Sequence, residues 1–387
     1  MSIDIFCIFA PKNDFKKVFV MNRIVLLLIC LLTLASAKAR RVIVDGLCYY
    51  LYSETREAVI DSDNSCSGEL DIPSKVTYEG QAYTVKGMSW QAFANCTGLT
   101  KVKIPKTIDH IVHHVLSDEP NVAGAVSPMN MNPFFGCTAL ESIYVDEGNP
   151  SMKSVGDVLF SKDGTSLYCY PAGLRAKSYV VPDGVVSIGI CAFAGNVYLE
   201  SVSLPERLTA LSGGVFEDCS QLRHINLPDG LTHLEAFSFR NCSSLPYMDI
   251  PSTVTSIGEY VFAGCSSLTS ITIPESVTYI GGQLFFGNEM ETIVIKGLVN
   301  KEFGEDGVKN ILDGLNPSAV IYTQPSEVER FQRWFAGSVK SLSSLSVNGV
   351  TSSGNVSSGV YDLQGRRLSG QPQRGGVYIQ DGRKILK

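Results

Sequence analysis

Apolar residues recur along the middle of the chain in one phrase that repeats at a fixed distance. The phrase begins with phenylalanine, then has cysteine three residues later and leucine three residues after that, as in FEDCSQL and FAGCSSL. From Phe193 to Phe285 each copy follows the previous one by 23 residues. A period in the twenties is typical of a solenoid, because one short rung cannot bury its apolar side without neighbours. The copies begin at Phe93, Phe134, Phe193, Phe216, Phe239 and Phe262, with a degenerate copy at Leu284-Phe285.

A single copy predicts a short strand followed by a return path. Leu268, Ile271 and Ile273 form the L-x-x-L-x-L core of a leucine-rich repeat. Apolar and polar residues alternate there, so Ser270 and Thr272 are expected to face outward while the isoleucines face the core. The proline that follows ends the strand, because it has no N–H to donate. The sequence therefore predicts a mostly β fold, a leucine-rich repeat solenoid built from 23-residue rungs.

The solenoid is expected to span residues 93–296, with two insertions that break its period. The first insertion, near 116–133, is rich in proline, asparagine and small residues and is predicted to be a loop. The second, near 146–181, contains Asp163-Gly164 between alternating apolar residues, which is the pattern of a β-hairpin. Insertions on a solenoid usually lie on one face, often the face that binds a ligand.

The repeat resembles the BspA-type leucine-rich repeat of bacterial surface proteins, and so do its flanks. Residues 38–92 resemble the N-terminal β cap of such repeats, and 297–340 resemble the C-terminal cap of a strand and a helix. In that helix, Ser326 and Glu329 predict a capping box. The resemblance implies a surface or secreted protein that is not an enzyme and acts in adhesion or cell contact. Three apolar residues are expected on one face of the cap helix, where they close the core: Val328, Phe331 and Phe335.

The first part of the chain, residues 1–37, is predicted to be a signal region. Its second half, MNRIVLLLICLLTLASA, has a basic residue, an apolar run and the small residues Ala35-Ser36-Ala37, as a secretory signal peptide does. The residues before Met21 do not fit such a leader, so translation is expected to start at Met21. The apolar run is too short to span a bilayer as a helix, so no transmembrane segment is predicted in the mature chain.

Two further segments follow the caps. Residues 341–359 are rich in serine and glycine and are predicted to be a linker. Residues 360–387 contain Asp381-Gly382 between apolar residues, which predicts a hairpin. This tail resembles a type IX secretion sorting domain that has been shortened, and it is either a processed export signal or a small β-module. The matching residues are Tyr361, Asp362, Leu363, Gly365, Arg366, Gly376, Val377, Tyr378 and Ile379.

Five of the eleven cysteines occupy one position of the repeat. They are expected to stack as a ladder of small buried side chains, and their parallel Cβ vectors keep them from pairing. Asn196 stands at the same position, which indicates that the position requires a small residue and not a sulfur atom. Cys48 and Cys66, in the N-terminal cap, are the best candidates for a disulfide. The ladder comprises Cys96, Cys137, Cys219, Cys242 and Cys265.

No catalytic, cofactor-binding or metal-binding residues are predicted. DHIVHH, residues 109–114, invites a zinc interpretation, but His110 and His113 fall on the return path of a rung and are interpreted as surface residues. DSDNSCSGE, residues 61–69, resembles a calcium loop but has Cys66 where glycine is required. The sequence contains no nucleophile elbow and no phosphate-binding glycine loop. The net charge of −6 does not favour nucleic acid as a partner, because nucleic-acid binding requires a basic face.

The repeat register also predicts which side chains face outward from the strands. Most are small and polar, as a solvated sheet requires, but one cluster contains tyrosine, which is enriched at interface cores. We therefore expect a monomeric, exported, non-enzymatic protein, on the cell surface or secreted, whose partner is a protein ligand such as a host or bacterial surface protein. A periplasmic location and a carbohydrate-binding module are the alternatives, and a hydrolase has the least support. The expected contact residues are His224, Asn226, Tyr247 and Asp249.

Overall fold

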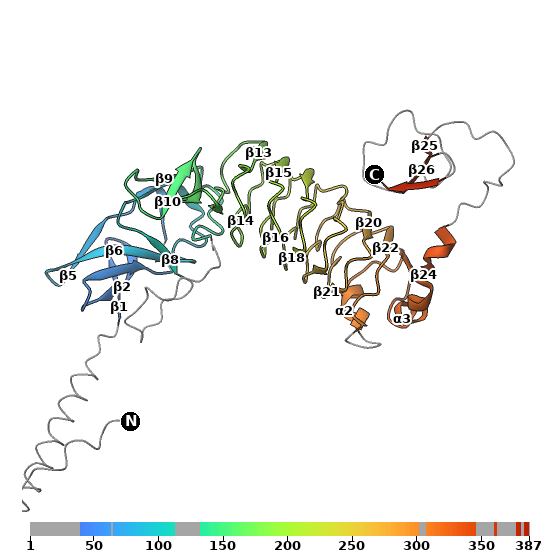
Figure 1. The fold of residues 1–387 in the computed structure, drawn as a ribbon. Helices are drawn as coiled ribbons and strands as arrows, with labels where there is room; N and C mark the ends of the chain where they lie inside the picture. The colour runs from blue at the N-terminus through green and yellow to red at the C-terminus, as the bar shows by residue number, and fades with distance from the viewer. Residues whose placement is uncertain are drawn as a thin grey trace, which may run out of the picture.

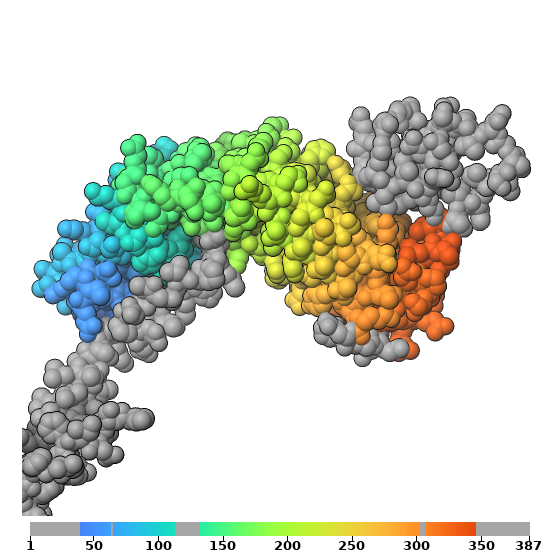
Figure 2. Space-filling view, viewed as in Figure 1, coloured from blue at the N-terminus to red at the C-terminus, as the bar shows by residue number. Residues whose placement is uncertain are grey.

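The computed structural model describes residues 39–62, 65–112, 132–301 and 307–345, and the backbone of three short strands in the C-terminal tail. An N-terminal β cap leads into a curved row of stacked rungs, which ends in a cap of short helices and strands (Figure 1). In the space-filling view these rungs form one continuous body (Figure 2). No helix among the described residues is long and apolar enough to cross a membrane.

Several predicted segments fall wholly or largely outside the described residues. They are the signal region 1–37, the first insertion near 116–133 and the linker 341–359. His113, which precedes the insertion, also lies outside the described residues. In the tail, an antiparallel sheet joins the strands β25 (Val360–Tyr361), β26 (Val377–Gln380) and β27 (Arg383–Leu386). The pairing of β26 with β27 confirms the predicted hairpin, while processing of the tail stays a prediction.

The N-terminal cap is a six-stranded sheet. Its strands in spatial order are β1 (Arg40–Val44), β2 (Leu47–Tyr52), β3 (Glu57–Ile60), β6 (Gln81–Ser89) and β5 (Lys75–Tyr78), with β8 (His110–Val112) beside β6. β1, β2 and β3 form an antiparallel meander, whereas β6 runs parallel to β3 and β8. Because β8 belongs to the return path of the first rung, it joins the cap sheet to the solenoid.

Parallel strands from successive rungs line one face of the solenoid. Ser178 lies opposite Ser201, and Ser201 lies opposite His224, so the 23-residue period of the sequence is the register of the sheet. The strands form three columns: β4 (Ser67–Asp71), β7 (Gly98–Ile104) and β9 (Ser142–Val145); β13 (Ser178–Val180), β15 (Ser201–Ser203) and β17 (His224–Asn226); β20 (Ser270–Ile273), β22 (Thr292–Ile295), β23 (Val320–Thr323) and β24 (Ser338–Ser341).

A second, narrower set of parallel strands lies on the return path. It comprises β16 (Ala210–Leu211), β18 (His233–Leu234), β19 (Ser256–Ile257) and β21 (Tyr279–Ile280). Each strand contributes one buried apolar residue and one residue that is exposed or half-buried, which is the alternation expected of a half-buried sheet.

The second insertion contains the predicted hairpin. β10 (Met152–Val155), β11 (Val158–Ser161) and β12 (Ser166–Cys169) are antiparallel, and β12 then pairs in parallel with β14 (Ser187–Ile188). Asp163 organises the turn between β11 and β12, because its Oδ1 accepts hydrogen bonds from the Ser161 hydroxyl at 2.6 Å and from the Thr165 N–H at 2.9 Å. These bonds favour the carboxylate and lower the pKa of Asp163 to about 2.

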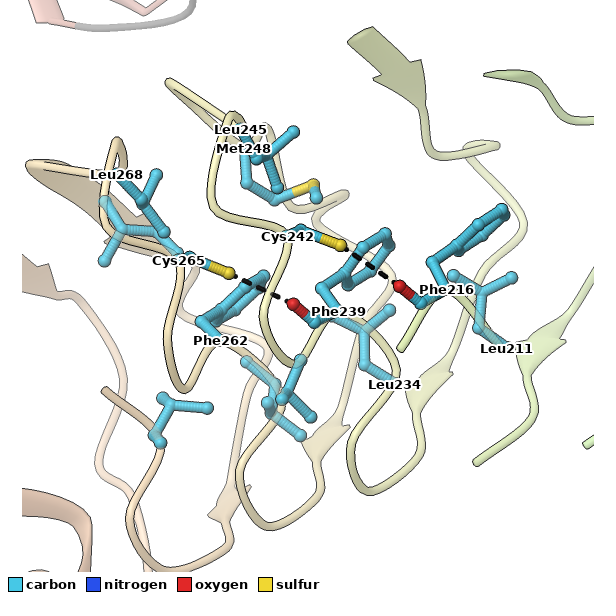
Figure 3. Close-up of a cluster of buried hydrophobic side chains, with 14 of the residues drawn as sticks. Leu211, Phe216, Leu234, Phe239, Cys242, Leu245, Met248, Phe262, Cys265 and Leu268 are labelled. Atoms are coloured by element: carbon cyan, nitrogen blue, oxygen red, sulfur yellow. Dashed lines mark hydrogen bonds between the residues drawn. The ribbon is translucent and has the colours of Figure 1, made fainter. Parts of the chain in front are cut away.

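A column of stacked phenylalanines runs through the core (Figure 3). The ring centroids of Phe193 and Phe216 are 5.0 Å apart, those of Phe216 and Phe239 are 5.5 Å apart, and those of Phe239 and Phe262 are 5.9 Å apart. All of these rings are buried, and one apolar cluster continues from the second insertion to the C-terminal cap. The core is therefore shared between rungs, as the repeat predicts.

The C-terminal cap closes this core with β23, β24 and two short helices, α2 (Lys309–Leu312) and α3 (Val328–Gln332). Phe331 and Phe335 are buried and Val328 packs against the same cluster, so the three residues close the core as predicted, although α3 ends at Gln332 and Phe335 lies beyond it.

The predicted capping box of Ser326 and Glu329 is wrong, because no side chain caps α3. Ser326 lies within a 3-10 turn, η3 (Pro325–Glu327), that precedes the helix. The N-cap residue of α3 is therefore Glu327. The side chain of Glu327 turns inward instead. It is fully buried and forms ion pairs with Lys301 and, at 2.8 Å, with Arg330.

Candidate ligand-binding face

The strand face of the solenoid carries two rows of outward side chains. Residues that the period aligns lie opposite one another in neighbouring strands, for example Ser203 beside Asn226 and Thr272 beside Val294. Most of these residues are small and polar. The first row is Lys101, Ser142, Ser201, His224, Tyr247, Ser270 and Thr292, and the second row is Lys103, Tyr144, Ser203, Asn226, Asp249, Thr272 and Val294.

The strand ladder is interrupted at the rung that carries Tyr247 and Asp249. β17 ends one column, β20 begins the next, and a single isolated bridge from Asp249 joins the rung to β20. In the rung before, the N–H of Arg223 donates to the carbonyl of Glu200 at 2.9 Å. The matching residue here is Pro246, which has no N–H, so this bond cannot form. Two of the four predicted contact residues therefore lie at a discontinuity in the sheet.

The predicted contact residues differ in what they do. The rings of His224 and Tyr247 lie close together across the discontinuity, with centroids 6.4 Å apart and planes at 59°. Asn226 bonds the backbone of the preceding rung, accepting from the Leu204 N–H at 3.2 Å and donating to its carbonyl at 3.4 Å. Asn226 therefore supports the strand, whereas His224 and Tyr247 present their rings to the outward face.

Asp249 adds a carboxylate to this cluster, and no lysine or arginine among the described residues forms an ion pair with it. Partial desolvation raises the pKa of Asp249 above its usual value. Ile225 and Ile250, which flank the discontinuity, are only partly buried, whereas Val202 and Ile271 in the neighbouring regular strands are buried. The cluster thus combines two aromatic rings and a carboxylate, beside a stretch of core that is less completely covered than in the regular rungs.

This geometry of stacked strands, return paths and a shared core agrees with a comparison to known families. The pattern of the "BspA type Leucine rich repeat region" matches six copies over residues 74–169 and 165–292, more than half of the chain. The chain belongs to the BspA-type leucine-rich repeat family. No curated protein matches it.

Several solved structures are similar to this BspA-type chain. The pneumococcal vaccine antigen PcpA is 17% identical, with a TM-score of 0.47, covering 78% of this chain and 98% of the antigen. A leucine-rich repeat protein from Bacteroides ovatus is 24% identical, with a TM-score of 0.41, covering 78% of this chain and 77% of that one. A leucine-rich cell surface protein from Faecalibacterium prausnitzii is 18% identical, with a TM-score of 0.35, covering 79% and 100% of the two chains.

The cysteine ladder of this BspA-type chain is buried and contains no disulfide, as predicted. After Cys96, each ladder thiol donates to a phenylalanine carbonyl of an earlier rung, as Cys242 does to Phe216 at 3.2 Å and Cys265 to Phe239 at 3.1 Å (Figure 3). Asn288 replaces cysteine in the last rung and donates its amide to Phe262 at 2.8 Å. The sequence interpretation was therefore incomplete, because the position requires a hydrogen-bond donor as well as a small side chain.

Replacing Cys242 with alanine is expected to destabilise the protein by about 1 kcal/mol, because it removes one of the two donors to the buried carbonyl of Phe216, which retains only the N–H of Cys219 at 3.1 Å. Cys242→Ser retains a donor and should lose less. Chemical denaturation of both variants measures the difference. Ser266→Ala removes an exposed hydroxyl that bonds the preceding rung in a similar way and should change the stability by less than about 0.5 kcal/mol.

The suggested disulfide between Cys48 and Cys66 is not formed in this structure. Cys66 lies beside Cys96 instead, and its backbone N–H donates to the Cys96 Sγ at 3.3 Å. His110 lies on the return path, as expected, but it is half-buried rather than on the surface, and its Nδ1 is 2.5 Å from Asp109. Among the described residues, no group of three or more histidine, cysteine or acidic side chains is placed to hold a metal ion.

Sequence reasoning missed a second exposed aromatic pair. Phe237 and Tyr260, both half-buried, stack with centroids 5.3 Å apart, and the Arg240 guanidinium lies 5.7 Å from the Phe237 centroid. Both backbones have positive φ, 63° and 55°, which side chains of this size rarely adopt. Because each ring covers a face of the other, the pair packs neighbouring rungs together. The period of the sequence aligns the two residues at one repeat position. The backbone at this position has positive φ in five successive rungs: Cys191, Gly214, Phe237, Tyr260 and Gln283.

Proposed function

We propose that this protein is exported and binds a protein ligand through the patch of His224, Tyr247 and Asp249, with Asn226 holding the rung in place. The observation that carries the proposal is the interruption of the sheet at Pro246, which coincides with the aromatic rings, the unpaired carboxylate and the partly exposed isoleucines. Regular rungs elsewhere present mainly serine and threonine. The binding surface is thus a local departure from the repeat.

The patch has the chemistry of a small protein–protein contact. Tyrosine supplies rigid apolar area with a polar tip, and the His224 ring, whose centroid is 6.4 Å from that of Tyr247, extends the aromatic surface. Asp249 would pair with a lysine or arginine of the ligand, an interaction that its partial desolvation strengthens. The surface is pre-formed on a rigid solenoid, so little conformational freedom is lost on binding.

A carbohydrate ligand is less well supported by the same face. Sugars bind aromatic platforms, and the outward rows offer few large aromatic side chains, mainly Tyr144, Tyr247 and Tyr322, well separated along the solenoid. The Phe237–Tyr260 stack covers its own ring faces. For a hydrolase, the described residues around the patch include His224 and Asp249 but no nucleophile with an adjacent base. We therefore propose adhesion or cell contact, with the protein acting as a monomer.

Tyr247→Ala is expected to weaken binding roughly thirtyfold, because truncating a central aromatic anchor at an interface commonly costs about 2 kcal/mol. Binding of the labelled mature protein to intact bacterial and epithelial cells gives the affinity. Thr278→Ala, on the exposed return path, is the matched control and should leave binding unchanged. Equal loss in the two variants would contradict the patch.

Treatment of the target cells distinguishes the ligand classes. A protein ligand predicts that protease treatment of the cells abolishes binding while glycosidase treatment leaves it intact. The opposite result would favour the carbohydrate-binding alternative. Protease shaving of the producing cells tests location, since surface exposure predicts release of solenoid peptides and a periplasmic protein would be protected.

A further inference from the structure

Cys66, which lies one strand before the cysteine ladder, differs from the ladder thiols. In the regular rungs, each thiol donates to a phenylalanine carbonyl of the rung before, as Cys137 does to Phe93 at 3.0 Å. Cys66 precedes the first phenylalanine of the repeat, so no such carbonyl is available to it. Its side chain hydrogen-bonds the Cys96 thiol instead, and its backbone N–H contacts the same sulfur at 3.3 Å. The end of the ladder is therefore a direct thiol–thiol contact.

The backbone around Cys66 also departs from the ladder geometry. β4 and β7 pair in parallel with Ser67 opposite Gly98, and the register shifts between Gly68 and Glu69. Cys66 and Cys96 therefore lie diagonally across the pair, whereas the other ladder cysteines occupy matching positions with parallel Cβ vectors. Parallel vectors prevent a disulfide in the regular rungs, but a diagonal pair in sulfur-to-sulfur contact is not held to that restriction.

We propose that Cys66 and Cys96 form a disulfide in the exported protein, which fastens the N-terminal cap to the first rung. The inference rests on the proposed export, because disulfides persist in oxidising compartments. The two cysteines are 30 residues apart, and the segment between them contains β4, β5 and β6. Closing this loop restricts the unfolded chain and stabilises the junction where β4 begins the first strand column.

The oxidant is a dithiol–disulfide carrier protein of the export compartment. The partly exposed Cys66, as thiolate, attacks one sulfur of the carrier disulfide and releases the other as a thiolate. That thiolate accepts the proton of Cys96, whose sulfur then attacks the Cys66 sulfur and displaces the carrier. The chain loses two electrons and two protons, and the carrier disulfide becomes two thiols. Burial beside Cys96 raises the pKa of the Cys66 thiol to about 11, so only a small fraction is thiolate at neutral pH and the first exchange step is slow.

Trypsin makes the pairing directly measurable, because it separates the cysteines of the cap and first rung. Cleavage after lysine and arginine places Cys48, Cys66 and Cys96 in the separate peptides 42–56, 57–75 and 87–101. The mature protein is collected from the exporting cells, its free thiols are blocked with N-ethylmaleimide under denaturing conditions, and the digest is analysed by mass spectrometry without reduction. We expect peptide 57–75 linked to peptide 87–101, with seven of the nine mature cysteines blocked.

Variants supply an independent readout. Dithiothreitol should lower the melting temperature of the wild-type protein by several degrees, and Cys66→Ser should remove this sensitivity. Cys242→Ser, in a regular ladder rung, is the matched control and should retain it. Nine blocked thiols in exported protein would overturn the inference while leaving export intact, and a link from peptide 57–75 to 42–56 would overturn it in favour of Cys48. If Cys66→Ser does not fold, peptide mapping of the wild-type chain still decides.

Discussion

Phe239→Ala is expected to destabilise the solenoid by about 3–5 kcal/mol, because it removes a fully buried ring and leaves a cavity that its neighbours cannot fill. Phe239 stacks on Phe216 at 5.5 Å and on Phe262 at 5.9 Å, so the substitution weakens the contacts to both adjacent rungs. In a solenoid, stability is approximately the sum of such nearest-neighbour contacts. Urea denaturation followed by circular dichroism measures the loss.

Phe286→Ala is the matched control for this substitution. Its ring is 50% exposed, although it directly follows the buried Phe285 in the sequence. The expected loss is below about 1 kcal/mol, since little apolar area leaves the core. Similar losses in Phe239→Ala and Phe286→Ala would contradict a continuous phenylalanine core.

Glu327→Ala is expected to cost about 3–5 kcal/mol in the C-terminal cap, because it leaves the buried charge of Arg330 without its carboxylate partner. Arg330 also donates to the carbonyls of Val299 and Asn300, both at 2.8 Å, so the side chain cannot move into solvent without breaking these bonds. These bonds of Glu327 and Arg330 hold α3 to the segment 299–301, which follows the last rung. Its loss should expose the end of the core.

The two tryptophans of the chain make this effect local and measurable. Trp90 follows the cap strand β6 and Trp334 follows α3, so their fluorescence reports on opposite ends of the fold. In Glu327→Ala, the Trp334 signal observed in a Trp90→Phe background should change at lower urea than the Trp90 signal observed in a Trp334→Phe background. Glu329→Ala, an exposed glutamate on the same helix, should leave both transitions in place. A simultaneous shift of both signals would argue against a local cap network.

The regular part of the fold follows from the sequence because the period is itself the register. Once Phe193 and Phe216 are aligned, the pairing of Ser201 with His224 and the outward direction of both side chains are determined. The break at Pro246 was also present in the sequence, because proline replaces a donor that the aligned residue Arg223 supplies. Only the comparison of each rung with its neighbours makes that signal visible.

Other features depend on contacts that no local pattern encodes. Glu327 forms an ion pair with Lys301, which lies in a different segment of the chain. The sequence at the start of α3 predicted a capping box instead of this buried ion pair. Cys66 meets Cys96 because the register shifts near Gly68, which the spacing of the cysteines does not indicate. The positive φ of Phe237 and Tyr260 arises from the rung geometry, against the preference of both residues.

Site-specific photo-crosslinking tests the central claim most directly. A photoreactive amino acid replaces Tyr247 in one version of the mature protein and Thr278 in another, and each is irradiated on intact target cells. The account predicts a protease-sensitive crosslinked product from position 247, reduced by excess unlabelled wild-type protein and weak or absent from position 278. Equal products from the two positions, or none from 247 while the protein remains bound, would contradict a ligand-binding patch on the strand face.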